Sequence, residues 1–333
     1  MSSIDTAAPP GNYGTGLVLF GILDLAAGVL YLAKTVIYAL LAISGAAASI
    51  PAEFGRAEIP VTSALSLAPA AFFLAIGFGS ILARRWARAL SLAFSSLWLA
   101  GGAIGAAFLF AGLPRMFGAL APLRERSASP SFVSPAIRAY AFILLVGIVL
   151  PGAYVLFYRA RGVKAECDRR DPDERWTDRL SITDLASAMV LAVGALLALH
   201  LGFSTTRQLL FFGHPLGSGM RGLAAAMAAA EIAAAWGICR GDRRAWTAAV
   251  AIMGIRAAAD AAIAWRVAGA GIEPIVRRAE SVRPDAKAAI DRLAPLHPLA
   301  AVALCVTVLA LASWAFVAWA ALRARAPTAS AAR

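Results

Sequence analysis

Apolar residues in this chain gather into long blocks, which short polar or basic segments separate. A helix needs about 20 apolar residues to cross the hydrocarbon core of a bilayer, and each block reaches or exceeds that length. The pattern therefore predicts an all-α membrane protein with eight transmembrane helices. Their expected ranges are 15–44, 61–83, 89–112, 136–158, 181–206, 220–239, 245–268 and 297–322.

The longest charge-dense segment is Arg159–Arg179, close to the midpoint of the chain. So many charges cannot lie in hydrocarbon, so this segment is expected to be a solvated connector. The predicted organisation is a four-helix transmembrane unit over 1–158, a polar cytoplasmic connector over 159–180 and a second four-helix unit over 181–333.

The two predicted units superimpose at a constant offset of 160 residues without gaps. Matches of the scarce residues Trp and Pro carry most weight, because alanine and leucine matches are frequent by chance in this composition. A four-span unit ends on the side where it began, so two such copies share one orientation and form a parallel repeat. The alternative is an accident of similar helix lengths. The matched pairs include Asp24/Asp184, Gly77/Gly237, Arg84/Arg244, Trp86/Trp246, Pro114/Pro274 and Pro135/Pro295.

Composition agrees with this class, with 60% hydrophobic residues, 15% charged residues and a mean hydropathy of +0.73. The net charge of +12 comes from short basic runs between apolar blocks, which do not form the basic face or stripe of a nucleic-acid-binding protein. These runs are typical of topology signals and of contacts with anionic lipid headgroups. The predicted headgroup contacts are Arg84, Arg85, Arg88, Arg243 and Arg244.

Orientation follows from the distribution of Lys and Arg. The two tightest hairpins, at 83–88 and 240–244, are both basic, which favours a cytoplasmic location for them and for both termini. The first fourteen residues contain Asp5 and no Lys or Arg, unlike a secretory signal, so the first helix is expected to remain as a span of a multi-pass protein of the inner membrane.

The first unit contains Gly21-Ile22-Leu23 with Gly28, then Gly77 and the run Arg84-Arg85-Trp86-Ala87-Arg88. This pattern resembles that of the small uncharacterised four-span membrane proteins of bacteria. The second unit shares only Gly237 and Arg244-Ala245-Trp246. The resemblance implies a fold and a membrane location, and no activity.

Charged residues at membrane depth are the most informative candidates for a site, because each is costly there and is usually paired. Glu231 and Arg256 are expected at similar heights, and Asp260 lies one helical turn after Arg256 on the same face. Lys34 and His200 are expected at a similar depth. Lys34 and Arg256 would balance Glu231 and Asp260, giving the neutral set that burial requires. The set is either a proton or solute pathway or a structural network that specifies which helices dock.

Two further features recur or are regularly spaced. Asp24 and Asp184 occupy matching positions, and Asp184 follows Ser181 in a capping-box pattern, so its expected role is to cap a helix. Asp24 lies deeper in its helix. Gly101 and Gly105 form a small-xxx-small pair, for which we expect a helix-packing seam.

The sequence favours passage or sensing of a small solute or of protons through the charged interior of the second unit. The alternative is a membrane scaffold or assembly partner, whose segments 114–135 and 273–293 would engage lipid, another protein or a further copy in an oligomer. An intramembrane enzyme acting on lipid is a third reading without a supporting motif, since HExxH, GxSxG and phosphate-loop patterns are missing from the sequence. The three cysteines have no metal-ligand or disulfide spacing, so neither a metal nor a cofactor is predicted.

Overall fold

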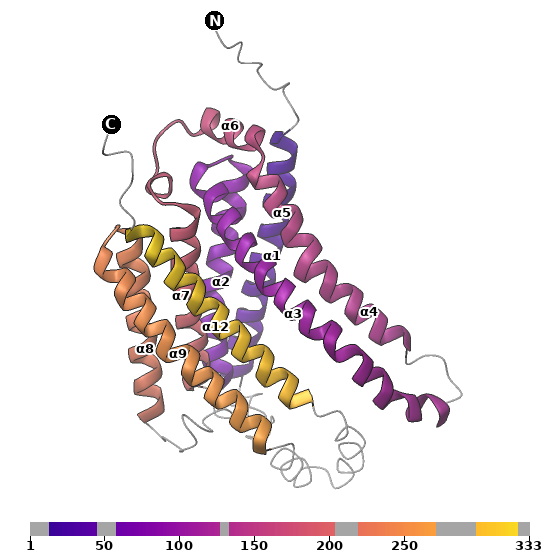
Figure 1. The fold of residues 1–333 in the computed structure, drawn as a ribbon. Coiled ribbons are helices and arrows are strands. Elements are labelled where there is room, and N and C mark those ends of the chain that lie inside the picture. Colours follow the sequence, from indigo (N-terminus) through magenta and orange to yellow (C-terminus); the bar gives the residue numbers. More distant parts are fainter. Residues whose placement is uncertain (1–12, 45–57, 127–132, 204–218, 271–297, 326–333) are drawn as a thin grey trace, which may run out of the picture.

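The computed structural model describes residues 13–44, 58–126, 133–203, 219–270 and 298–325, and in these ranges the regular structure is helical. Figure 1 shows long helices running side by side along one axis. The principal helices are α1 (Tyr13–Ile43), α2 (Glu58–Ile81), α3 (Arg85–Arg126), α4 (Val133–Leu144), α5 (Leu150–Arg159), α7 (Ile182–Phe203), α8 (Gly219–Cys239), α9 (Arg243–Ala270) and α12 (Pro298–Arg325).

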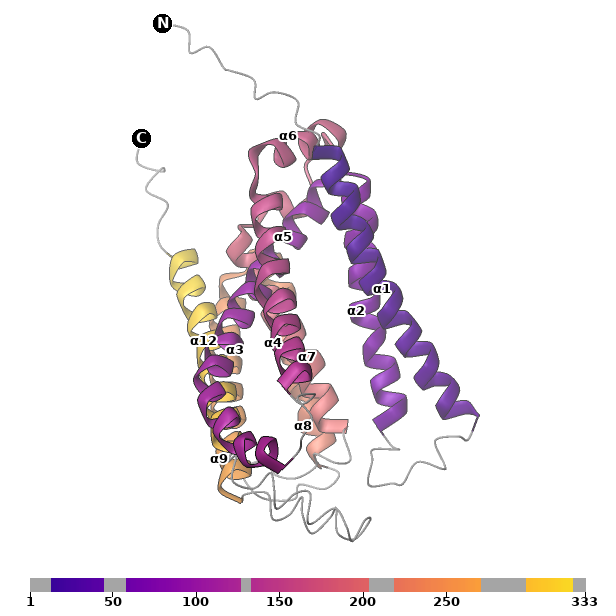
Figure 2. The same cartoon turned by 90° about the vertical axis from the view of Figure 1, so that its right-hand side faces the viewer.

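Successive long helices alternate in direction, and the beginning of α1, the connector and the end of α12 lie at the same end of the bundle (Figures 1 and 2). The α4 and α5 segments, joined by a π-helical turn over Leu145–Val149, act as one rod. Helix α1 packs along α2, and α7 packs along α8, while α3 packs along α5 and α9 along α12. The pairing of helices in the first half thus recurs in the second.

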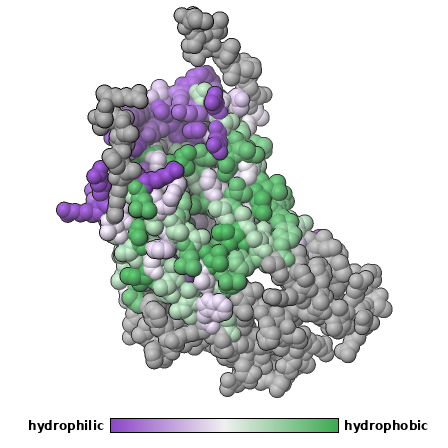
Figure 3. Space-filling model, viewed as in Figure 1, coloured by the Kyte–Doolittle hydropathy of each residue, from purple (hydrophilic) through white to green (hydrophobic). Residues whose placement is uncertain are grey.

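The outer surface of this bundle is apolar. Helix α1 alone exposes many large hydrophobic side chains, and Figure 3 shows hydrophobic residues over the middle of the molecule with hydrophilic residues gathered at the connector end. Within the described ranges, seven segments are long and apolar enough to cross a membrane. They are Tyr13–Ile43, Ile59–Ile81, Arg85–Phe108, Tyr140–Arg159, Ile182–His200, Arg221–Cys239 and Ala303–Ala324.

Helix α9 is not among these seven, although it is 28 residues long. It carries Arg243 and Arg244 in its first turn, Arg266 near its end, and Arg256 and Asp260 between them. The predicted count of eight spans therefore depends on how the two charges in the middle of α9 are accommodated.

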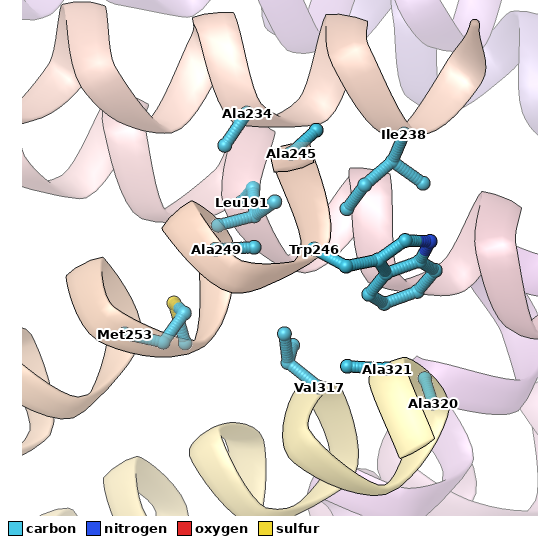
Figure 4. Close-up of a cluster of buried hydrophobic side chains, with 10 residues drawn as sticks. All are labelled: Leu191, Ala234, Ile238, Ala245, Trp246, Ala249, Met253, Val317, Ala320 and Ala321. Atoms are coloured by element: carbon cyan, nitrogen blue, oxygen red, sulfur yellow. The ribbon is translucent and has the colours of Figure 1, made fainter. Parts of the chain in front are cut away.

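The core of the second half is built around Trp246 of α9. Its indole lies between Ile238 of α8 and Val317 of α12, with small alanines filling the space between the helices (Figure 4). A smaller cluster joins the two halves, where Ala93 of α3 packs against Leu185 of α7. Small residues at these positions let the helices approach closely, which is the main source of helix association in a membrane.

The α2–α3 and α8–α9 hairpins have the same geometry. Each helix ends in a Schellman motif with one residue of positive φ, Ala83 (54°) in the first hairpin and Gly241 (75°) in the second. The equivalent positions differ by 158 residues, so at this hairpin the structure departs from the gapless offset of 160. When the two turns are superimposed, Arg84 and Trp86 therefore lie two residues away from their sequence matches Arg244 and Trp246. The equivalent hydrogen bonds run from the Arg84 N–H to the Gly79 oxygen (2.7 Å) and from the Asp242 N–H to the Gly237 oxygen (2.9 Å).

The connector is folded against the bundle. Its first part forms α6 (Arg161–Arg170), and its second part docks on the α2–α3 hairpin through the buried carboxylate of Asp171. Asp171 accepts hydrogen bonds from Arg175 at 2.8 Å and from Arg84 at 3.3 Å. The hydrogen bond from Arg175 holds the pKa of Asp171 below its usual range. This part of the connector is thus held to the bundle by charged groups.

Arg85 of the same hairpin lies 3.1 Å from Asp168 and 3.3 Å from Asp178. Two of the arginines expected at lipid headgroups, Arg84 and Arg85, therefore pair with connector carboxylates. Arg243 and Arg244 are exposed and remain predicted headgroup contacts.

Helix α3 approaches the π-helical turn closely where the two cross at Gly102. A Cβ atom on Gly102 would lie 1.8 Å from the carbonyl oxygen of Gly147, which only glycine avoids. The expected seam at Gly101 and Gly105 is wrong, because a Cβ on either residue would meet nothing within 4 Å. The seam lies one residue away, on a different face of the helix.

One further expectation about α3 is corrected. The helix does not end near Gly112 but continues through Pro114 to Arg126. Proline removes one backbone hydrogen bond without necessarily ending a helix in a membrane protein. The segment 273–293 lies outside the described residues, as do the side chains of 114–135.

Replacing Gly102 by alanine should destabilise the protein by about 3 kcal/mol, because α3 and the π-helical turn must separate to admit the methyl group. Gly101→Ala, its neighbour, should change stability by less than about 1 kcal/mol and in the favourable direction. Unfolding of the two purified variants in detergent micelles measures the difference. Equal stabilities would show that the two helices do not meet at Gly102.

Candidate functional site

The structure brings together three of the charged residues that the sequence indicates. Arg256 of α9 lies 2.9 Å from a carboxylate oxygen of Glu231 on α8, and its Nε lies 3.4 Å from Asp260 one turn further along α9. The sequence spacing of four residues predicts the second contact. The first contact needs α8 and α9 to be antiparallel neighbours, which the tight hairpin between them ensures.

A third helix takes part in this cluster. Arg256 also donates a hydrogen bond to the backbone carbonyl of Gly194 on α7. A Cβ on Gly194 would lie only 3.0 Å from both the guanidinium and the Glu231 carboxylate, so the missing side chain gives both groups access to α7. Arg256 therefore ties α7, α8 and α9 together at one point.

The cluster is deep in the protein. Glu231 is fully buried and Arg256 is 8% exposed. Counting about 1.5 Å per residue from the start of α9, Arg256 lies about 20 Å along that helix, near the middle of a hydrocarbon core about 30 Å thick. A lone charge at this depth is very costly, so each member of the pair makes the other tolerable.

Lys34, expected in the same set, lies elsewhere. Its side chain is exposed on α1, and its ammonium group lies 5.8 Å from the ring centre of Tyr38, one turn nearer the end of the helix. The physical reason is that a lysine can extend its apolar stem along a lipid-facing surface and place its charge toward the interface. Lys34 therefore does not neutralise the carboxylates of the second half.

His200 of α7 is also apart from the cluster. It is partly buried, six residues beyond Gly194, and within the described ranges no hydrogen bond or ion pair joins it to Glu231 or Asp260. The helical repeat explains the separation, because six residues further along α7 is about 9 Å closer to the far end of the bundle.

Asp24 of α1, for which the sequence assigned no role, is a buried member of the site. It is 4% exposed, and one of its carboxylate oxygens accepts a hydrogen bond of 3.0 Å from the Tyr154 hydroxyl on α5. The other oxygen is buried with no hydrogen-bond partner among the described residues. Its apparent counterpart Asp184 caps α7, in a reciprocal pair of hydrogen bonds with Ser181, which confirms the capping prediction.

A cavity of about 770 Å³ lies between the two halves and connects these groups. Asp24 from the first half lines it, and so do Arg256 and Asp260 from the second. The rest of its wall is mainly apolar and aromatic, with contributions from α1, α2, α3, α5, α7, α9 and α12. The combination of a large apolar pocket and a few convergent charged groups is the usual form of a small-molecule binding site.

The charges around this cavity do not cancel. Among the described residues, the cavity and the cluster behind it hold three carboxyl groups, of Asp24, Glu231 and Asp260, and one guanidinium, of Arg256. The net charge of these residues is therefore not zero as predicted, because Asp24 lies at the cavity and Lys34 does not. Low-dielectric surroundings do not tolerate two uncompensated negative charges, so the carboxyl groups must hold protons or be matched by a bound cation.

The fold and this site together define an all-helical integral membrane protein, on the evidence of several long apolar helices around a charged interior. Comparison with protein-family models, with characterised proteins and with solved structures found no match for the chain.

The ion pair gives a direct prediction for stability. Arg256→Met should destabilise the protein by about 3–5 kcal/mol, because it leaves Glu231 buried without a counter-ion. Glu231→Gln should cost less, since Asp260 still faces the guanidinium. Unfolding in detergent micelles provides the measurement.

The double variant Glu231→Gln with Arg256→Met provides the control. Because it removes both charges, it should recover most of the stability that Arg256→Met loses. Additive losses in the double variant would show that the two residues are not coupled.

Proposed function

We propose that this protein binds a small solute or protons in the cavity between its halves and moves them across the membrane. The proposal rests on the carboxyl groups from both halves that line one cavity, where one oxygen of Asp24 has no hydrogen-bond partner among the residues that the structure describes. Carboxyl groups that exchange protons at membrane depth are the usual elements of a proton relay.

The proposal extends the pathway beyond the second half. Asp24 of α1 and Asp260 of α9 line the cavity from opposite halves of the protein. A proton that enters at one carboxyl group can leave from the other if water fills the space between them. Arg256 stays paired with Glu231 and keeps the pathway from carrying three negative charges.

The architecture we propose is an eight-span protein built from two parallel four-helix units. Helix α9 would be the eighth span, because it lies along α12 and its two deep charges have partners in Glu231 and in each other. The equivalent turns of the two hairpins support duplication. The protein would lie in the inner membrane of the cell with both termini in the cytoplasm. Arg243 and Arg244 would contact anionic lipid headgroups.

The topology is tested by the side of the membrane on which each end of α9 lies. Arg240→Cys in the α8–α9 hairpin and, in a second variant, Gly271→Cys, both in a background without the three native cysteines, should react with a membrane-impermeant thiol reagent from opposite sides. The thiol at position 240 should react from the same side as the connector. Reaction of both positions from one side would exclude α9 as a span.

Proton movement is tested in liposomes that contain the purified protein and a pH-sensitive dye, with a potassium diffusion potential as the driving force. Proton entry should exceed that of protein-free liposomes and fall at least tenfold in Asp24→Asn and in Asp260→Asn. Asp173→Asn, which alters a highly exposed connector carboxylate, should leave it unchanged. Absent flux, or flux indifferent to Asp24 and Asp260, would contradict the proposal.

A further inference from the structure

Aromatic side chains form a continuous wall on one side of the cavity. The ring of Tyr31 on α1 stacks on Phe73 of α2 with centroids 5.8 Å apart, and Phe73 meets Phe94 of α3 edge to face at 5.3 Å. Phe94 in turn lies 5.7 Å from Trp98 one turn further along α3. All four line the cavity, and Tyr154 of α5 lines it beside Asp24.

An aromatic wall of this kind has a definite chemical preference. The faces of the rings carry partial negative charge and attract cations, best for indole and phenol, and more strongly where water is excluded. The same rings offer apolar contact area to a hydrophobic body. The ring faces repel an anion, and the hydrogen-bond donors on the described part of this wall are the Tyr31 hydroxyl and the Trp98 indole N–H.

The carboxyl groups complete the same preference. In the described part of the chain, one buried oxygen of Asp24 has no hydrogen bond, and Asp260 is partly exposed to the cavity. The guanidinium of Arg256 is already paired with Glu231 and with the Gly194 carbonyl. A positively charged guest would therefore supply the compensation that the site lacks, whereas a negatively charged guest would add to the excess.

We propose that the solute of this cavity is a lipophilic organic cation, held with its apolar groups against the aromatic wall and its charge near Asp24 and Asp260. This inference rests on the proposed function in taking the cavity as the solute site, and it adds the chemical class of the solute. Small hydrated metal cations fit this cavity less well, because they need about six oxygen ligands and the mainly apolar wall offers few besides the carboxyl oxygens of Asp24 and Asp260.

Binding of such a cation competes with protons. Without a guest, the carboxyl groups hold protons, and a bound monocation replaces one of them to keep the charge of the site unchanged. The described titratable groups that face Asp24 are Tyr154 and Tyr158 of α5, and those that face Asp260 are Arg256 and Glu231. A phenol is a far weaker acid than a carboxylic acid, so the exchange takes place at the carboxyl groups.

Tetraphenylphosphonium is a suitable probe, and titration calorimetry of the purified protein in detergent, with the detergent alone as blank, measures its binding. The wild-type protein should bind it with release of about one proton, and the affinity should rise by up to about tenfold per pH unit while the carboxyl groups titrate. Asp24→Asn and Asp260→Asn should each weaken binding at least tenfold, and Asp173→Asn should not. Tetraphenylborate, which has the same shape and the opposite charge, should not bind to the cavity.

Three results would overturn the inference: absence of tetraphenylphosphonium binding, affinity independent of pH in the wild type, or equal binding of tetraphenylborate. The pH dependence uses only the wild-type protein, so it decides the question even if a carboxyl variant does not fold. Proton flux in liposomes with no tetraphenylphosphonium binding would leave the proposed pathway in place and remove the cation as its solute. Binding without flux would leave the cation site in place and remove proton passage.

Discussion

The cluster at Arg256 is the constraint on which the arrangement of the second half depends. A guanidinium in the middle of α9 would prevent this helix from lying in hydrocarbon, yet Glu231, Asp260 and the Gly194 carbonyl surround it. These contacts come from three helices, so they also fix how α7, α8 and α9 dock. The apolar packing around Trp246 then fills the bundle between this point and the hairpin.

The carboxyl groups that neutralise Arg256 are part of an excess of acidic groups at the cavity. Glu231 and Asp260 share the guanidinium of Arg256, and Asp24 adds an acid from the first half that has no cation beside it among the described residues. A protein whose only need was stability would gain by replacing such groups with apolar residues. Their convergence on a cavity of about 770 Å³ is the reason for treating them as functional.

Much of the fold follows from the sequence, because blocks of apolar residues specify helices of membrane-spanning length. The contact between Arg256 and Asp260 also follows, since a spacing of four places both on one helix face. The sequence pattern does not predict how each helix is rotated about its own axis. That rotation places Gly102 rather than Gly101 against Gly147, and it turns Lys34 outward. Asp24 was recognisable as a deep acid, but its partner Tyr154 is 130 residues away, and only the packing of α1 near α5 brings them together.

Among the described residues the cavity carries more acid than base, so we expect it to hold protons until a cation enters. Infrared spectroscopy of the purified protein detects the carbonyl band of a protonated carboxylic acid and separates buried groups by their slow response to deuterium exchange. We expect such a band near neutral pH in the ligand-free protein, with its intensity reduced in Asp24→Asn and on addition of tetraphenylphosphonium. A spectrum of the folded protein without a protonated carboxyl group at that pH would contradict it.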